Sequence, residues 1–103
     1  MTVRFTPQAR KHLSNIAQYI RRHNPSAAPK VRQRIKQTTA TLDQFPHIGH
    51  EGADPATREV VVPQSPYIVV HTVDARGDVY VIGIYHGAQL RPGQADLDHP
   101  EDE

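Results

Sequence analysis

The chain has 103 residues, a formal net charge of +1 and no cysteine. This length allows one small domain with a single core, and the lack of cysteine excludes disulfides and thiolate chemistry. Because the sequence contains no signal-peptide segment and no apolar run long enough to span a bilayer, we expect a soluble, cytoplasmic protein.

The net charge conceals an uneven distribution. Residues 1–36 contain nine Lys or Arg and no acid, whereas residues 93–103 contain five acids. We therefore expect a folded domain over residues 1–92, followed by an acidic, disordered tail over residues 93–103. The domain itself holds 12 basic residues and six acids. Such an excess favours a nucleic acid or an acidic protein as partner, although it equally fits a solvated surface.

The first part of the chain predicts a short strand and a helix. Residues 3–5 alternate in the manner of an edge strand. Thr6 and Pro7 mark a helix start, because Thr can cap a helix and Pro at the first helical position needs no N–H partner. The helix then carries an apolar stripe and is expected to end before Pro25.

A second helix follows after a short connection, so the two helices are predicted to form an antiparallel hairpin. We expect Ser26 to cap this helix, because Pro29 is tolerated only in a first turn. Pro46 marks its end. One face of the helix is expected to be buried through residues spaced three or four apart: Ala28, Val31, Ile35, Thr38, Leu42 and Phe45.

The second half of the chain predicts a meander of three strands. Residues 47–56 are rich in Gly, Pro, Asp and His and are expected to form a surface connection. Three β-branched and aromatic runs follow at 57–62, 66–71 and 79–85. Gly77 fits a hairpin loop between the last two runs. The order of strand, helix, helix and three strands indicates an α+β fold, with the helical hairpin packed on a small, mostly antiparallel sheet.

Seven short motifs follow one another along the domain: Phe5-Thr6-Pro7-x-Ala9, Ile16-x-x-Tyr19-Ile20, Asn24-Pro25-x-Ala27-Ala28, Phe45-Pro46-x-x-Gly49, Thr57-Arg58-Glu59, Pro66-Tyr67-Ile68-Val69 and His86-Gly87-Ala88-Gln89. No single motif is specific, but the ordered set resembles the RelE/ParE toxins, the toxin halves of bacterial type II toxin–antitoxin pairs. The resemblance implies the family's fold, a helical hairpin on an antiparallel meander. It also implies a partner, a ParD-like antitoxin encoded next to the toxin.

The resemblance leaves two activities open. RelE-like members are ribosome-dependent endoribonucleases that cut mRNA, whereas ParE-like members are associated with poisoning DNA gyrase. Cleavage through the RNA 2′-OH needs a cation that holds the phosphate, and Tyr67 occupies the position where the nuclease pattern usually places an arginine. Because a neutral phenol cannot replace a guanidinium there, we favour a ParE-like toxin that inhibits gyrase and cleaves no bond itself.

The alternative is an mRNA interferase, whose catalytic candidates are Arg58, Tyr85 and His86. Adjacent residues of a strand point to opposite faces, so Tyr85 and His86 share a site only if the strand has ended. A structural interpretation competes with this one: His86 and Gln89 would satisfy backbone groups at the strand end, and Arg58 would pair with Glu59. A third possibility is a toxin-like fold retained only to bind its antitoxin.

Two sets of residues are expected to contact partners. The target-binding candidates lie in and after the meander: Arg58, Tyr67, His86, Gln89 and Arg91. The antitoxin is expected on the exposed helical hairpin, which suits a partner's amphipathic helix or added strand. The antitoxin-binding candidates are Leu13, Ile16, Tyr19, Ile20, Val31 and Ile35.

The histidines at positions 47 and 50 raise the question of a metal site. Glu51 and Asp54 are close to them in sequence, but two loop histidines without a third fixed ligand are a weak signal. We therefore predict no metal and no cofactor. A further histidine, His71, alternates with apolar neighbours and is expected to face an adjacent strand or solvent.

Overall fold

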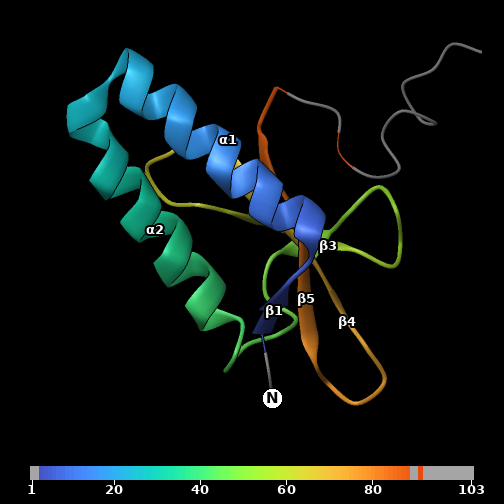
Figure 1. Cartoon of the computed structure of the whole chain (residues 1–103). Helices are drawn as coiled ribbons and strands as arrows, with labels where there is room; N and C mark the ends of the chain where they lie inside the picture. Colours follow the sequence, from blue (N-terminus) through green and yellow to red (C-terminus); the bar gives the residue numbers. More distant parts are fainter. Residues whose placement is uncertain (1–2, 89–90, 92–103) are drawn as a thin grey trace, which may run out of the picture.

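The structure, a computed structural model, describes residues 3–88 and residue 91. Within these residues it contains two α-helices and a five-stranded sheet (Figure 1), which confirms the predicted α+β fold. The elements in chain order are β1 (Val3–Phe5), α1 (Pro7–His23), the 3₁₀ turn η1 (Pro25–Ala27), α2 (Ala28–Thr41), β2 (His50–Glu51), β3 (Arg58–Val61), β4 (Tyr67–Val73) and β5 (Val79–His86).

Neither described helix is long and apolar enough to cross a membrane. Gln89 and the predicted tail, residues 93–103, lie outside the described residues.

The strands form one sheet in the order β1-β5-β4-β3-β2. β1 runs parallel to β5 and the other neighbouring strands are antiparallel, which confirms the predicted meander. Gly77 turns the β4–β5 hairpin with a φ of 89°, a conformation that glycine adopts without steric cost. Residues 47–56 were expected to form a surface connection; His50 and Glu51 within it are exposed, but they also pair with β3 as the strand β2, which was not predicted. Two residues are too few for a strand pattern to show in the sequence.

The start of α1 follows the sequence prediction. The Thr6 hydroxyl oxygen accepts a hydrogen bond from the Ala9 N–H at 3.1 Å, and Pro7 occupies the first helical position. On the side of the sheet, the His12 Nδ1 accepts the Ile84 N–H at 3.1 Å. This N–H belongs to the part of β5 beyond its pairing with β1. Helix α1 therefore satisfies a backbone group of β5 that β1 does not reach.

The start of α2 differs from the prediction. A 3₁₀ turn precedes the helix, and Ala27 holds the cap position without any side-chain hydrogen bond. Ser26, the predicted cap, instead donates its hydroxyl hydrogen to the Asn24 Oδ1 at 3.1 Å. Phe45, which was expected on the buried face, is 55% exposed. Because α2 ends at Thr41, Phe45 no longer continues the helical stripe.

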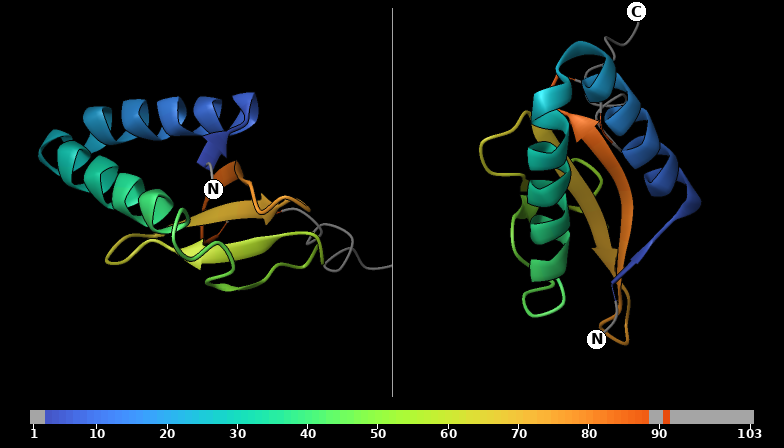
Figure 2. Two further views of the ribbon diagram at one scale, coloured as in Figure 1. Left: turned by 90° about the horizontal axis from the view of Figure 1, so that it is seen from below. Right: turned by 60° about the vertical axis from the view of Figure 1, so that its left-hand side comes forward.

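Both helices pack on the same face of the sheet, and among the described residues the opposite face carries no helix (Figure 2). We call these two sides the helix face and the outer face. The core lies between the helices and the helix face, and burial of its apolar side chains, at roughly 25 cal/mol per Å², is the main source of stability. The core includes Ala9, Ile20, Ile35, Leu42, Tyr67, Val69, Val79, Val81 and Ile84.

A β-bulge in β5 decides which side chains reach each face. The pairing with β4 skips Ile82, which is an extra residue between two successive pairs. Because of this insertion, Val81 and Ile84 both reach the core, although residues three apart in a regular strand face opposite sides. Beyond the bulge, Tyr85 therefore lies on the outer face and His86 on the helix face.

Candidate functional site

A groove of about 1040 Å³ opens between the two helices. Helices α1 and α2 are close at their hairpin turn and diverge toward the sheet (Figure 2). The lining combines apolar residues of three elements with basic residues of both helices. The apolar residues are Phe5 of β1, Leu13, Ile16 and Ile20 of α1, and Val31 and Ile35 of α2. The basic residues are Arg21, Arg32 and Lys36.

Five of the six predicted antitoxin-binding residues line this groove, and Tyr19 does not. Tyr19 is 59% exposed and stacks on His23, with ring centroids 4.1 Å apart. Ile20 and Ile35 are buried at the floor and belong to the core, whereas the other three are half-buried. Phe5 was not among the predicted antitoxin-binding residues, although its alternation with exposed Arg4 in β1 is the signal of an inward-facing side chain.

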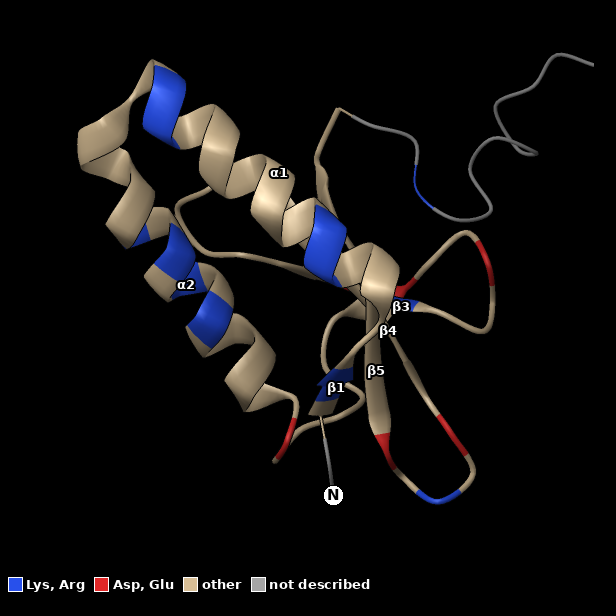
Figure 3. Cartoon of the chain, viewed as in Figure 1, with Lys and Arg blue, Asp and Glu red and all other residues tan. Residues whose placement is uncertain are grey.

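The helical half of the chain is basic. Figure 3 shows Lys and Arg on both helices and the acids on the connections and strands that follow. No acidic residue precedes Asp43, and Arg21, Arg32 and Lys36 are exposed where they line the groove. A positive rim beside an apolar floor is complementary to an amphipathic segment with acidic flanks.

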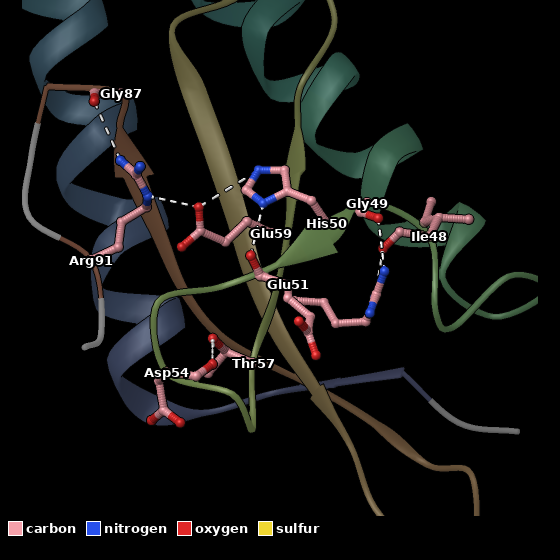
Figure 4. Close-up of polar contacts among 10 residues, drawn as sticks. Ile48, Gly49, His50, Glu51, Asp54, Thr57, Glu59, Gly87 and Arg91 are labelled. Atoms are coloured by element: carbon pink, nitrogen blue, oxygen red, sulfur yellow. Dashed lines mark hydrogen bonds and ion pairs between the residues drawn. The ribbon is translucent and has the colours of Figure 1, made fainter. Parts of the chain in front are cut away.

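Arg58, a candidate for both catalysis and target binding, holds a loop against the sheet. Its Nη2 donates to the Gly49 carbonyl at 2.8 Å and its Nε donates to the Ile48 carbonyl at 3.4 Å. Figure 4 shows these two carbonyls on the loop that precedes β2. Two of the guanidinium donors are therefore already bonded to backbone oxygens.

Tyr67 lies in the core, where little of it is available to a target. It is 7% exposed, and burial raises the pKa of its hydroxyl, with Tyr19 adding to the rise. Its ring meets the ring of His86 edge-on, with centroids 5.8 Å apart. The His86 Nδ1 in turn accepts the Ala88 N–H at 3.1 Å. These two target-binding candidates are thus neighbours on the helix face, where β5 ends.

The three catalytic candidates do not converge on one site. Because β5 continues through residue 86, Tyr85 and His86 point to opposite faces of the sheet. The Tyr85 hydroxyl accepts a hydrogen bond from the Gln8 Nε2 at 3.4 Å, and burial raises its pKa. The β4 partners of Arg58 and His86 are four residues apart, which is roughly 13 Å along the strand.

Glu59 and Arg91 form an ion pair on the outer face (Figure 4). Glu59 is 2% exposed, and the Arg91 Nε donates to its Oε1 at 2.9 Å. The His50 Nε2 lies 3.9 Å from the same oxygen. Glu59 therefore pairs with Arg91. The structural interpretation of the sequence had paired Glu59 with Arg58, and that prediction was wrong. Glu59 and Arg91 are 32 positions apart in the chain, so no local pattern could reveal their pairing.

Of the two histidines considered for a metal site, His47 lies in a turn and His50 in strand β2. His50 is hydrogen-bonded through Nδ1 to the Glu51 carbonyl at 2.9 Å, and the Asp54 carboxylate accepts the Ala56 N–H at 3.0 Å. Among residues 3–88 and 91, no group of three or more His, Asp or Glu side chains is arranged to hold a metal ion.

His71 is fully buried, which excludes solvent as its surroundings. Its Nε2 lies 2.7 Å from the Pro46 carbonyl, and because a carbonyl only accepts, this nitrogen carries the hydrogen. The Nδ1 has no hydrogen-bond partner among the described residues. Burial lowers the pKa of the ring; the bond to Pro46 opposes this, and the charges of Arg58 and His47 add to it. A neutral His71 therefore fastens the loop after α2 to the sheet.

Comparison with known proteins places this fold in a family. Residues 3–91 match the family described as the ParE toxin of the type II toxin-antitoxin system parDE. The chain is 32% identical over 90 residues to Y4kP of Sinorhizobium fredii, which is named as a toxin, and the match covers 87% of this chain and 92% of Y4kP. The structure described as the chromosomal ParDE TA system from P. aeruginosa has the same fold, with a TM-score of 0.75 and 20% identity over 84% of this chain and 95% of that chain. The chain therefore belongs to the ParE toxin family of type II toxin–antitoxin systems.

Proposed function

We propose that this ParE-type toxin inhibits DNA gyrase and so blocks replication, and that a ParD-like antitoxin neutralises it by binding. Membership of the ParE toxin family supports the toxin role. The similar P. aeruginosa structure is described as a ParDE system, which supports an antitoxin partner. Because gyrase acts on DNA in the bacterial cytoplasm, the proposed function implies a cytoplasmic protein.

The observation that carries the choice of a binding toxin is the arrangement of β4 and β5. RNA cleavage needs a phosphate-binding cation, a base and an acid within reach of one phosphodiester. Buried Tyr67 occupies the position of the expected arginine. Tyr85 and His86 face opposite sides, and Arg58 is engaged with loop carbonyls. This arrangement supports a toxin that acts by binding over an mRNA interferase.

The groove between the helices supports a helical segment of the antitoxin as the neutralising element. An α-helix is about 10 Å across with its side chains. A groove of about 1040 Å³ can receive the side chains along one face of such a helix. Apolar residues of the partner would cover Leu13, Ile16 and Val31, and its acids would face Arg21 and Arg32. Such a segment can fold on binding, because contact with the groove buries apolar side chains that the segment alone cannot bury.

A supercoiling assay tests the proposed target. Purified toxin is titrated into gyrase with relaxed plasmid, and toxin preincubated with its antitoxin serves as the control. We expect the toxin to inhibit supercoiling and the antitoxin to restore it. Full gyrase activity at a large molar excess of folded toxin would contradict the proposal.

Two further assays separate the alternatives. An mRNA interferase would cut mRNA in the A site of translating ribosomes, and His86→Ala would abolish the cutting but leave antitoxin binding intact. The gyrase proposal predicts no such cutting by the wild-type chain. Expression without the antitoxin should slow growth; normal growth would favour the third possibility, a fold retained only to bind the antitoxin.

A further inference from the structure

The outer face of the sheet contains an acid that the proposed function does not use. Glu59 is buried there, although no helix among the described residues covers this face. A buried carboxylate is unfavourable unless it is paired or hydrogen-bonded. In register with Glu59 are Val70 on β4 and, beyond it, Gly83 on β5. Val70 has no polar side-chain group and Gly83 has no side chain, while His50, the β2 residue in register with Glu59, stays 3.9 Å away. A partner within hydrogen-bond distance therefore has to come from elsewhere in the chain.

Arg91 is this partner, and it connects two strands that are not neighbours. Its side chain is 13% exposed, and its Nε lies 2.9 Å from the Glu59 Oε1. The Arg91 Nη1 donates to the Gly87 carbonyl at 3.3 Å, and the Gly87 N–H donates to the Pro66 carbonyl at 2.7 Å. Since β4 lies between β3 and β5, the guanidinium ties the exit of β5 to β3 across β4.

The surroundings of the carboxylate are shaped to hold it. A Cβ placed on Gly52 would come within 3.3 Å of the Glu59 Oε2 and would collide with the Thr57 hydroxyl. A residue without a side chain is therefore needed there for the β2–β3 connection to close over Glu59. His50 stands 3.9 Å from Oε1 on the exposed side. The neighbouring Val70 is fully buried although it lies on the outer face.

We propose that the ion pair between Glu59 and Arg91 is a latch that holds the C-terminal end of the domain on the outer face. The inference stands independently of gyrase inhibition. The latch fixes the chain at residue 91 on a face that no described helix covers. Glu59 is then a positioning residue, and Arg91 is an anchor of the fold instead of a contact for the target.

Full-length variants test the latch: Glu59→Gln, Arg91→Gln, both together, and Arg76→Gln as a control in the exposed β4–β5 turn. The readouts are thermal unfolding and hydrogen exchange of peptides from β3 and from residues 84–91. Each latch change should lower Tm by about 10 °C, because it removes a charge-assisted hydrogen bond between two largely buried side chains. The double variant should lose clearly less than the sum of the two single losses. Arg76→Gln should unfold within about 1 °C of the wild type.

Hydrogen exchange separates a latch from general destabilisation. In Arg91→Gln, exchange of the C-terminal peptide should rise at least about tenfold at 25 °C, while β4 stays protected. Three results would overturn the latch: Arg91→Gln as stable and protected as Arg76→Gln, additive losses in the double variant, or a Glu59→Gln chain that fails to fold while Arg91→Gln is unaffected. None of these readouts involves gyrase, so failure of the proposed function leaves the test intact.

Discussion

The groove between the helices and the polar residues of the sheet differ in how their side chains are already engaged. In the groove, half-buried residues such as Leu13 and Ile16 face open space. On the sheet, Arg58 is bonded to loop carbonyls and Glu59 to Arg91. An open apolar surface gains free energy when a partner covers it, whereas a bonded polar group must first give up a partner. We infer that the helices recognise partners and that these polar residues mainly hold the fold together.

The largest expected effect is on antitoxin binding. Leu13→Glu places a charge on the apolar wall of the groove and should weaken the antitoxin by about 100-fold, or roughly 2.7 kcal/mol, in isothermal titration calorimetry. Val61→Glu is the matched control, because Val61 is 58% exposed on the outer face, and it should bind like the wild type. If both variants bind the antitoxin equally well, the antitoxin does not use the groove between the helices.

Arg58→Ala tests whether a polar residue of the sheet stabilises the fold. Loss of the bonds to the Ile48 and Gly49 carbonyls should lower the free energy of unfolding by about 2 kcal/mol in urea titrations. Arg76→Ala, at an exposed turn, should change it by no more than about 0.5 kcal/mol. An Arg58→Ala protein with unchanged stability but without gyrase inhibition would show that Arg58 contacts the target after all.

His71 makes stability depend on pH. Its pKa is lowered in the folded protein from the ordinary value of 6.5, so folding favours the neutral ring. The corresponding stability is fully present above the unfolded pKa and is lost as the pH falls through the folded pKa. From pH 7.5 to pH 5, the wild type should therefore lose more stability than His71→Gln.

Urea titrations at both pH values measure this loss, and Gln18→Ala is the control because Gln18 is exposed on α1 and carries no titratable group. That variant should keep the pH dependence of the wild type. Identical slopes for the wild type and His71→Gln would show that the buried ring does not control acid stability.

The smallest expected effect concerns the starts of the two helices that form the groove. Thr6→Ala removes the cap of α1 and should cost about 1 kcal/mol of unfolding free energy. Ser26→Ala should cost less than about 0.5 kcal/mol, because Ser26 does not cap α2. Thermal unfolding of the two variants measures the difference. Equal losses would contradict the assignment of a cap to Thr6 alone.

The parts of the fold with a local chemical signal were predictable from the sequence. Thr6 and Pro7 start α1, Gly77 turns a hairpin, and the helical spacing of apolar residues indicates one buried face. The parts that were missed depend on distant contacts. Strand β2 exists only because β3 offers it a partner, and the bulge at Ile82 shows only in the register with β4.

The same division applies to the candidate site. Residues of the groove could be predicted, because a helical stripe reports directly which side chains share a face. The polar candidates could not be assigned roles in this way. A sequence does not reveal that Arg58 bonds to the loop before β2 or that Arg91 returns to Glu59, and the bulge reverses the faces on which Tyr85 and His86 lie.

The separation of charge along the chain has a kinetic consequence. The helical layer is positive, and all described acids lie after α2. An acidic partner is therefore steered toward the helices before any contact is made, and its association rate should fall as salt shortens the Debye length, which is about 8 Å at physiological ionic strength. An antitoxin guided in this way would reach the groove in few encounters, so that a newly released toxin could be recaptured before it diffuses to its target.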